Sequence, residues 1–598
     1  MSLVNLFSTE EASSFAKTKL QPTTAAKEWT GALQFEHTFT SDLPGDPVVP
    51  QSPYDQGTES VDIPEAKFRA SRKVTGALWS WAVPSHHDSP QLISVSSSGA
   101  QLIGLTKQRF LENPQAAAEV WSGNQMLSGS RPWAHCYGGH QFGVWAEQLG
   151  DGRAISLGEV VGDHGRWEVQ FKGAGRTPYS RFADGYAVRR SSIREYLAAE
   201  HMAALGIPTS RSLALVFTDR SVFREETELG AIVTRLAPSW VRFGSFELPA
   251  SRQDSQLLRR LADYVIAWHF PQLLSQETEA KNRYALLLHQ IVLKTALMVA
   301  HWQAIGFCHG VMNTDNMSVL GLTIDYGPYA FLDSYNPDFI CNHSDPTGRY
   351  AFKEQPRVAL WNLLRLAGPI SVLIDEGQNV PDESVHMNDV KESTIALVRE
   401  SLNSFVGEYT NQYAVIMRKK FGLVSKTSED DLKLIIQPFL DLLEKAGTDY
   451  TFAMRSLCDV PAILASPERD TLLEAHIDSL IARSLTCDAD NWKSELKQYY
   501  LQVYLPRLQD DAGELTDQCA RDITQAMKRQ NPKFVLRNWV AQDVIEQSDK
   551  GNTEIVDQVL DLMTKYAFDD DVPHVPDAER YAGPVPNWGE GLQCSCSS

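Results

Sequence analysis

His309-Gly-Val-Met-Asn-Thr-Asp-Asn-Met-Ser-Val-Leu-Gly-Leu-Thr-Ile-Asp-Tyr-Gly327 is the stretch from which the expected fold follows. It places Asp315, Asn316 and Asp325 in two short loops joined by an apolar run. Carboxylate and amide oxygens are ligands suited to magnesium. Asp and Asn also form turns in ordinary loops, but that explanation fits any one of these residues better than it fits all three. We therefore interpret the stretch as part of a nucleotide-binding site.

The order of residues in this stretch has the form of a kinase catalytic loop followed by an Asp-Phe-Gly turn. In kinases the base is the Asp of a His-Arg-Asp triplet, and an Asn five residues later holds a metal ion. The spacing from position 311 to Asn316 matches this pattern, but position 311 is Val. The sequence thus keeps the groups that hold metal and phosphate, and it lacks the usual base for phosphoryl transfer.

A lysine on a strand and a glutamate on the next helix form the second part of the expected site. Residues 167–172 alternate apolar and polar side chains, which is typical of a half-buried strand with Lys172 on its polar face. Ser192-Ile-Arg-Glu195 predicts the start of a helix that continues to about Leu205. Glu195 also fits a capping box, but a strand lysine paired with a helix glutamate is how kinases position phosphates. The nearby glycine loop and Asp325 favour the pairing.

Segments rich in glycine and arginine flank this strand. Gly150-Asp-Gly152-Arg153 precedes an apolar run at 154–161, and a second such segment covers 173–185. Glycine permits close approach of the backbone to phosphate, and arginine adds charge and directional hydrogen bonds. Predicted strands at 212–217 and 231–236 complete a small sheet. Arg235 on the last strand and Arg242 just beyond it are placed to reach the cleft.

These elements predict an α+β, protein-kinase-like fold of two lobes, a pseudokinase by its missing base. Residues 1–95, rich in Pro, Ser, Asp and Thr, are expected to form a partly disordered N-terminal extension. The smaller lobe is expected over 96–245, with a helix near 100–119. The larger lobe is expected over 246–420, with helices at 257–270 and 284–304. A helical C-terminal region is expected over 421–598. Helix breaks are expected at Pro369, Pro461 and Pro532.

The composition excludes several classes of protein. A formal net charge of -20 and a pI near 5.2 disfavour a broad surface for nucleic acid, so no nucleic-acid partner is expected. The longest apolar stretch, Ala285–Ala304, contains His289, Lys294 and His301, so no membrane span is expected. The eight cysteines form no CxxC pair, and structural zinc is therefore not expected.

Longer motifs surround the site residues. They are Tyr137-Gly-Gly-His-Gln-Phe-Gly143, Gln148-Leu-Gly-Asp-Gly-Arg-Ala154, Val169-Gln-Phe-Lys-Gly-Ala-Gly-Arg-Thr-Pro-Tyr-Ser-Arg181, His309-Gly-Val-Met-Asn-Thr-Asp-Asn-Met317, Asp325-Tyr-Gly-Pro328 and Asn531-Pro-Lys-Phe-Val-Leu-Arg-Asn538. By these motifs the chain resembles the selenoprotein O family, also called YdiU, from about residue 30 to its C-terminus. The resemblance implies a protein-kinase-like fold that transfers AMP from ATP to Ser, Thr or Tyr hydroxyls of proteins. It also implies that ATP binds in a flipped orientation, with its α-phosphate toward the acceptor.

The resemblance implies a role for each residue of the expected site. Asp315 becomes the proton acceptor, which explains why Val311 is tolerated. Asn316 and Asp325 become ligands of Mg²⁺ or Mn²⁺. Lys172, held by Glu195, becomes a phosphate contact. The remaining contacts expected with ATP are Gly150, Gly152, Arg153, Asp184, Gly185, Arg235, Arg242 and Asp325.

Two other classes of function also fit these residues. The first is phosphoryl transfer with Asp315 as an unconventional base, and the second is a nucleotide-binding scaffold without turnover. ATP labelled separately on its α- and γ-phosphates would distinguish all three. The sequence leaves open which proteins are modified and which oligomeric state the chain adopts.

The C-terminal tail, Cys594-Ser-Cys596-Ser-Ser598, is either an inert end of the chain or a redox-active segment, and its spacing alone favours neither interpretation. In the resemblance Cys596 stands where animal members have selenocysteine, so selenium chemistry is not expected. We expect Cys596 to form a disulfide with Cys341, in the segment 334–356, as bacterial relatives pair the matching positions. Cys594 is the competing partner of Cys596, through a small strained ring. The resemblance also implies redox proteins as targets and a mitochondrial location, although the N-terminus shows no clear transit peptide.

Overall fold

The computed structural model describes residues 33–54, 65–274, 280–377, 390–485, 488–572 and 575–594. Its largest sheet has nine strands, in the order β2-β4-β7-β8-β11-β10-β3, with β1 beside β7 and β9 beside β11. All of its strand pairs are antiparallel. These strands are β1 (Phe35–Glu36), β2 (Trp79–Trp81), β3 (Gln91–Val95), β4 (Trp133–His135), β7 (Ala154–Gly162), β8 (Gly165–Lys172), β9 (Ala187–Val188), β10 (Arg211–Phe223) and β11 (Thr227–Ala237).

Two smaller antiparallel pairs lie outside this sheet. The hairpin β5–β6 follows β4, and β12–β13 frames the stretch 309–327. The pair β7–β8 forms a hairpin, with Gly162 opposite Gly165. The mixed α and β class is therefore confirmed, while the likeness to protein kinases stays a prediction. The bounds are β5 (His140–Gln141), β6 (Val144–Trp145), β12 (Phe307–Cys308) and β13 (Ala330–Phe331).

Strands β1, β2 and β3, from the described residues between 33 and 95, belong to the large sheet, whereas the sequence predicted a partly disordered extension there. Strand β2 pairs with β4, and β1 pairs with β7. Phe39 of α3 (Thr38–Asp42) stacks on Trp133 with ring centroids 4.7 Å apart. These aromatic side chains bury enough apolar area to order a segment whose Pro and Ser content suggested disorder. Residues 1–32 and 55–64 lie outside the described residues.

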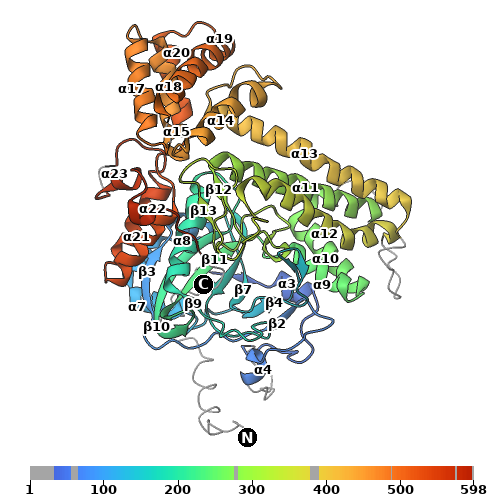
Figure 1. Cartoon of the computed structure of the whole chain (residues 1–598). Helices are drawn as coiled ribbons and strands as arrows, with labels where there is room; N and C mark the ends of the chain where they lie inside the picture. The colour runs from blue at the N-terminus through green and yellow to red at the C-terminus, as the bar shows by residue number, and fades with distance from the viewer. Residues whose placement is uncertain are drawn as a thin grey trace.

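Helix α8 (Arg189–Ala204) lies against β10 and β11 and carries Glu195. It begins at Arg189, before the predicted start, and its N-cap is Val188, so Ser192 and Glu195 form no capping box. Two C-terminal helices, α21 (Asn538–Asp549) and α22 (Glu554–Thr564), also pack on α8 (Figure 1). The predicted C-terminal region is thus divided in space, because this part of it joins the same core as α8.

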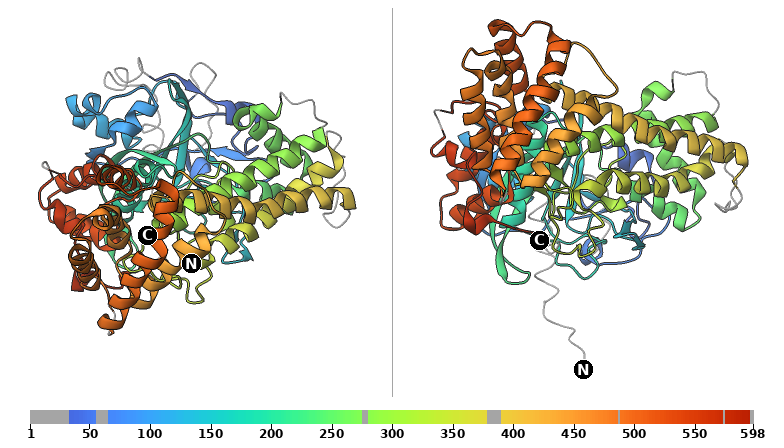
Figure 2. Two further views of the ribbon diagram at one scale, coloured as in Figure 1. Left: turned by 90° about the horizontal axis from the view of Figure 1, so that it is seen from above. Right: turned by 45° about the horizontal axis from the view of Figure 1, so that its top comes forward.

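Helices α10, α11, α12 and α13 follow the last strand of the large sheet in the chain. Of these helices, α11 packs on both α12 and α13 (Figures 1 and 2). Pro369 lies inside α12, so the predicted break is wrong there. The helix continues because Leu366, Ile370 and Leu373 are fully buried, which offsets the backbone hydrogen bond that proline removes. Pro461 lies in the first turn of α16, and Pro532 lies between α20 and α21. The bounds are α9 (Phe243–Ser251), α10 (Ser255–His269), α11 (Ala280–Ile305), α12 (Gln355–Glu376) and α13 (Glu392–Lys420).

Two segments, Arg283–Ile305 and Phe352–Glu376, are long and apolar enough to cross a membrane by length and composition. Their most apolar windows are 56% and 61% buried inside the protein. Core helices show the same pattern, because they are covered by protein on most sides.

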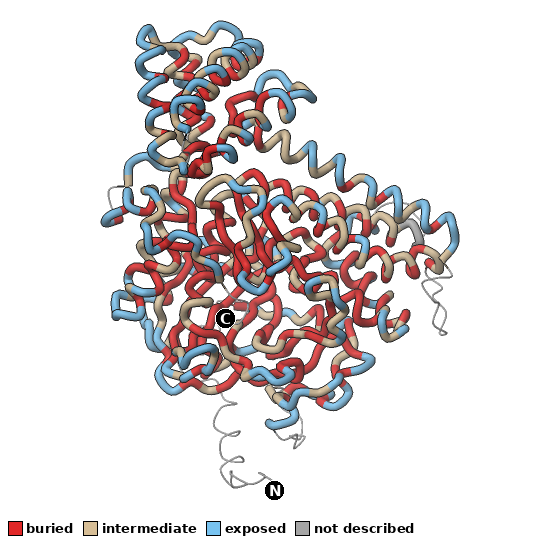
Figure 3. The backbone as a smooth tube through the Cα atoms, viewed as in Figure 1, coloured by how far each residue is buried: buried red, intermediate tan, exposed pale blue. Residues whose placement is uncertain are grey.

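Helices α14 to α20 form a separate bundle, whose hydrophobic core continues onto Cys308 of β12, Ala330 of β13 and Met417 of α13. Much of the outward surface of these helices is exposed (Figure 3). The helix predicted near 100–119 is instead divided into α5, α6 and α7, with Thr106 and Asn113 at the two later N-caps. The remaining bounds are α4 (Glu65–Arg69), α5 (Ser97–Leu102), α6 (Lys107–Glu112), α7 (Pro114–Trp121), α14 (Gln437–Ala446), α15 (Tyr450–Ser456), α16 (Val460–Ala465), α17 (Arg469–Ile481), α18 (Ala489–Gln498), α19 (Leu505–Ala512), α20 (Asp517–Lys528) and α23 (Ala578–Tyr581).

Candidate functional site

The residues that the sequence assigned to ATP and metal all line one cavity. Its volume is about 860 Å³, large enough for a nucleotide. It lies between the large sheet and the stretch 309–327, as the predicted two-part site requires. The assigned residues on its wall are Gly150, Gly152, Arg153, Lys172, Asp184, Gly185, Glu195, Arg235, Arg242, Asp315, Asn316 and Asp325.

The predicted pairing of strand lysine and helix glutamate is present. Lys172 Nζ, at the end of β8, lies 2.6 Å from Glu195 Oε2 on α8. Arg235 of β11 joins the pair, with Nη1 2.9 Å from Glu195 Oε1. Since β8 and β11 are adjacent strands, the sheet register itself brings the two cations to the same carboxylate.

Asp325 is the centre of a buried group of charges. Its carboxylate lies 2.6 Å from Arg235 Nη1 and 3.5 Å from Lys172 Nζ, and it also pairs with Arg242. Burial alone would raise the pKa of Asp325, but Arg242, Lys172 and Arg235 hold that pKa well below its usual value. The backbone of Asp325 has φ 56°, a left-handed conformation that non-glycine residues adopt mostly at functional sites. The Asp325 carboxylate is therefore ionised, and its ion pairs with Lys172, Arg235 and Arg242 hold it in position.

Aromatic rings hold the two buried arginines. The Arg235 guanidinium lies 4.2 Å from the centroid of the Trp240 ring, and that of Arg242 lies 4.6 Å from the Tyr137 ring. Both side chains are only 2% exposed. Cation–π contacts of this kind compensate part of the cost of burying a charge. The cavity thus contains three fixed cations, Lys172, Arg235 and Arg242, at the depth where phosphates would bind.

His309 ties the catalytic loop to the strand end before Asp325. Its Nε2 lies 3.0 Å from the carbonyl oxygen of Ile324, and its Nδ1 accepts from the Val311 N–H at 3.4 Å. Burial lowers the pKa of His309, so the ring is neutral and carries its proton on Nε2. The loops that carry Asn316 and Asp325 are thereby held in a constant relative position.

Asn316 and Asp325 provide a donor set that fits a divalent cation. Asn316 lies in the 3-10 turn Thr314–Asn316, and its Nδ2 donates to the Val311 carbonyl at 3.0 Å. Its Oδ1 is left as the available ligand atom. An amide oxygen and an ionised carboxylate that both line the phosphate cavity are ligands that Mg²⁺ or Mn²⁺ accepts. The residues present therefore fit the metal that the sequence led us to expect.

Asp315 is a buried carboxyl with one unused oxygen. The residue is 8% exposed, its Oδ2 accepts from Gln141 Nε2 at 3.2 Å, and its Oδ1 has no hydrogen-bond partner in the described structure. Gly139 packs so closely that a Cβ there would lie 2.7 Å from Oδ1. Burial raises the pKa of Asp315 to about 7. A carboxyl of this kind can accept a proton from a group that enters the cavity.

The comparison with known proteins agrees with this geometry. A family model described as "Protein adenylyltransferase SelO" matches residues 65–564. The chain belongs to the SelO family. It is 43% identical over 518 residues to the "Protein nucleotidyltransferase YdiU" of Cupriavidus metallidurans, which covers 86% of this chain and 88% of that protein. The protein of the same name in Herminiimonas arsenicoxydans is 41% identical over 542 residues, which cover 90% of this chain and 97% of that protein. The one in Xanthomonas campestris is 40% identical over 584 residues, which cover 95% of this chain and 99% of that protein. This SelO-family chain is a nucleotidyltransferase.

The structure of this SelO-family chain adds a positioning network that the sequence analysis missed. His140 Nδ1 lies 2.6 Å from Glu247 Oε1, the Thr314 hydroxyl donates to Glu247, and the His140 N–H donates to Thr314 Oγ1 at 2.7 Å. This network holds the turn that carries Asp315 against the β5–β6 hairpin. Gln141, beside His140, was part of a quoted motif, but only the folded hairpin shows that it reaches Asp315.

Asp184 is positioned differently from a simple nucleotide contact. Its carboxylate forms an ion pair with Arg224 at 2.8 Å and accepts from the Tyr186 N–H at 3.0 Å. The next residue, Gly185, has φ 80°, and a Cβ there would lie 2.4 Å from the backbone nitrogen of Arg176. The turn therefore requires glycine, and the ion pair fixes this side of the cavity.

The C-terminal tail of the SelO-family chain lies along the segment that contains Cys341. The Cys594 N–H donates to the Cys341 carbonyl at 3.4 Å, and the His343 N–H donates to the Cys594 carbonyl at 3.1 Å. Cys341 is fully buried, and burial raises the pKa of its thiol. Cys596 lies outside the described residues, so its predicted disulfide with Cys341 stays a prediction. The tail nevertheless ends its described part beside the predicted partner.

Proposed function

We propose that this SelO-family protein transfers AMP from ATP to Ser, Thr or Tyr hydroxyls of proteins, with Mg²⁺ or Mn²⁺ as cofactor. The observation that carries the proposal is the pairing of Asp315, a buried carboxyl with an unused oxygen, with the donor pair Asn316 and Asp325. Position 311, where kinases carry their base, is Val. The residues that can accept a proton and hold a metal are therefore present, and the usual kinase base is absent.

In this mechanism the Asp315 carboxylate accepts the proton of the attacking hydroxyl, while Gln141 orients Oδ2. The new bond joins the hydroxyl oxygen to the α-phosphorus, the bond between the α- and β-phosphates breaks, and pyrophosphate leaves. Lys172, Arg235 and Arg242 provide fixed positive charge for the leaving phosphates. A bound divalent metal, held by Asn316 and Asp325, would neutralise phosphate charge.

We also infer that the molecule has the two-lobed arrangement of protein kinases. Three features support this inference: the antiparallel sheet, the pair of Lys172 and Glu195 across β8 and α8, and the catalytic loop anchored by His309. In this view the chain is a pseudokinase whose cleft transfers AMP and not the γ-phosphoryl group.

The first prediction concerns which phosphate is transferred. With a divalent metal, the protein should incorporate label from ATP labelled on the α-phosphate, into itself or an acceptor protein, and should release labelled pyrophosphate from ATP labelled on the γ-phosphate. The expected acceptor atoms are hydroxyls, so the label should be stable to hydroxylamine. Incorporation of the γ label alone would instead assign phosphoryl transfer, and binding without incorporation of either label would assign a scaffold.

We further propose that the tail regulates this activity by oxidation, within a mitochondrial redox setting. Cys594 lies beside Cys341, and Cys596 is two residues further on, a distance of at most about 7 Å along the chain. A disulfide between Cys341 and Cys596 forms when an oxidised dithiol partner accepts their two electrons and two protons. A Cβ at Gly310 would lie 2.5 Å from Cys341 Sγ, so this thiol packs directly on the catalytic loop.

The second prediction tests this regulation. Peptide mapping of the oxidised protein should find the bridge between Cys341 and Cys596, and reductant should raise AMP transfer several-fold. Cys596→Ser should show the reduced-state activity under both conditions. Cys519→Ser, a change on α20 in the separate bundle, is the matched control and should behave like the unmodified protein. Failure to find the bridge, together with equal activity of Cys596→Ser and unmodified protein, would leave the tail without a regulatory role.

A further inference from the structure

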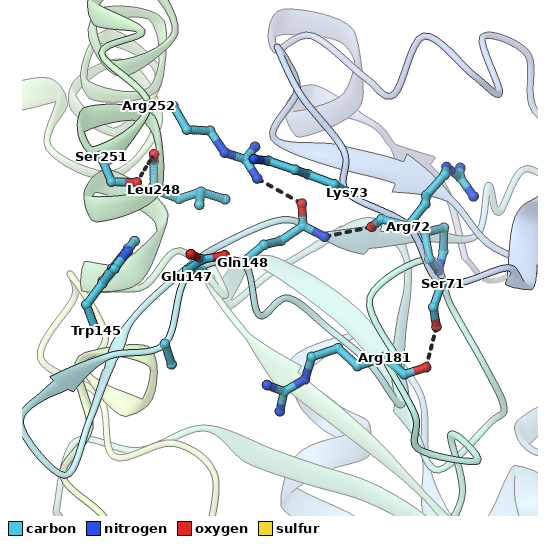
Figure 4. Close-up of a pocket in the computed structure, with 12 residues that line it drawn as sticks. Ser71, Arg72, Lys73, Trp145, Glu147, Gln148, Arg181, Leu248, Ser251 and Arg252 are labelled. Atoms are coloured by element: carbon cyan, nitrogen blue, oxygen red, sulfur yellow. Dashed lines mark hydrogen bonds between the residues drawn. The ribbon is translucent and has the colours of Figure 1, made fainter.

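A second pocket, of about 550 Å³, lies beside the nucleotide cavity (Figure 4). Arg181 lines both, so the two spaces are neighbours across one side chain. Figure 4 shows Arg181 and Trp145 on two sides of this pocket and Lys73 and Arg252 on a third. Of these four residues, Arg181 alone also lines the nucleotide cavity.

The pocket carries positive charge that the fold does not neutralise. Lys73, Arg181 and Arg252 form no ion pair with any described residue, and Arg252 donates to neutral acceptors, including Gln148 Oε1 at 2.9 Å. Glu147 is the one acidic residue on the wall. Arg72 also lines the pocket, but it is paired with Asp46. In a chain of net charge -20, three cations against one acid mark a local site for an anionic group.

The position of the pocket fits a contact with the protein acceptor better than a contact with ATP. The β5–β6 hairpin contacts Asp315 through Gln141 and continues through Trp145 to Glu147, which lines the second pocket. Six residues of backbone separate Gln141 from Glu147, so they are at most about 20 Å apart. An extended acceptor segment whose hydroxyl lies at Asp315 can thus place a side chain in the pocket within about six residues.

We propose that this pocket binds an acidic side chain of the protein acceptor, a few residues from the modified hydroxyl. The proposal rests on the proposed function for the position of the hydroxyl. Lys73, Arg181 and Arg252 pair with the carboxylate, while Trp145 and Leu248 pack against its aliphatic part.

The test compares two fluorescein-labelled peptides that each contain one Tyr, one with flanking glutamates and one with glutamines in their place. Fluorescence anisotropy with the full chain should show the acidic peptide binding at least about tenfold more tightly at low salt, and this difference should shrink as salt rises. Lys73→Glu should remove most of the difference. Lys550→Glu, the same charge change at the exposed C-cap of α21, is the matched control and should retain it.

Transfer of AMP from α-labelled ATP to the same peptides provides the second readout. Lys73→Glu should raise KM for the acidic peptide about tenfold and leave KM for ATP unchanged. Equal binding of the two peptides would overturn the proposal, as would equal effects of Lys73→Glu and Lys550→Glu. A raised KM for ATP in Lys73→Glu would instead assign the pocket to the nucleotide. Selective binding without any AMP transfer would contradict the proposed function while supporting the pocket.

Discussion

Asp315→Asn is expected to lower kcat for AMP transfer by about 10²- to 10⁴-fold while ATP affinity stays within about twofold. Asn has almost the same shape as Asp and keeps an acceptor for Gln141, whose Nε2 lies 3.2 Å from Asp315 Oδ2. It cannot accept a proton, however, and Oδ1 of Asp315 is the one carboxylate oxygen that the fold leaves without a partner at this point of the cavity. The loss should therefore fall on chemistry and not on nucleotide binding.

Steady-state kinetics with α-labelled ATP, together with calorimetric titration of a non-hydrolysable ATP analogue, separates the two effects. Asp338→Asn is the matched control, because Asp338 is largely exposed and its one ion pair with a described residue is to Lys353. Near-normal turnover of Asp315→Asn would show that another group accepts the proton. A loss of metal-dependent binding equal to that of Asp325→Asn would show that Asp315 is a metal ligand.

Local sequence pattern was enough to predict the parts of the site that lie on regular elements. Lys172 could be placed on a strand by alternation, and Glu195 on a helix, because both periodicities reflect burial on one face. Their pairing follows once two adjacent strands and the helix that covers them are known. Glycine loops and the Asp-Tyr-Gly turn are similarly local signals, since they depend on backbone conformation at single residues.

Features that depend on long-range packing could not be read from the sequence. The network of His140, Glu247 and Thr314 joins residues far apart in the chain, and each of them alone is an ordinary polar residue. The strands between 33 and 95 are too short for periodicity to detect, and they are ordered by aromatic contacts with residues such as Trp133. The return of α22 to α8 also arises only in the folded chain.

Asp325→Asn is expected to abolish transfer, by at least about 10³-fold, and also to destabilise the protein without nucleotide. The neutral amide removes one metal ligand, and with it the metal-dependent part of ATP binding. It also removes the carboxylate that pairs with Lys172, Arg235 and Arg242. Leaving buried charges without their partner typically costs about 3–5 kcal/mol, so the thermal midpoint should fall by at least about 2 °C.

Binding of a polyphosphate without metal distinguishes the loss of the metal ligand from the loss of the buried ion pairs. Tripolyphosphate in the presence of EDTA should raise the thermal midpoint of Asp325→Asn more than that of the unmodified protein, because the phosphate oxygens meet three cations that no longer pair with Asp325. Magnesium added with ATP should increase the midpoint of the unmodified protein further and leave the variant unchanged. Glu200→Gln, which removes a different buried carboxylate paired with Arg211 away from the cavity, should be destabilised without any added response to tripolyphosphate. If Asp325→Asn kept both its midpoint and its response to magnesium, the Asp325 carboxylate would be neither a required partner of the buried cations nor a metal ligand, and the metal would bind elsewhere.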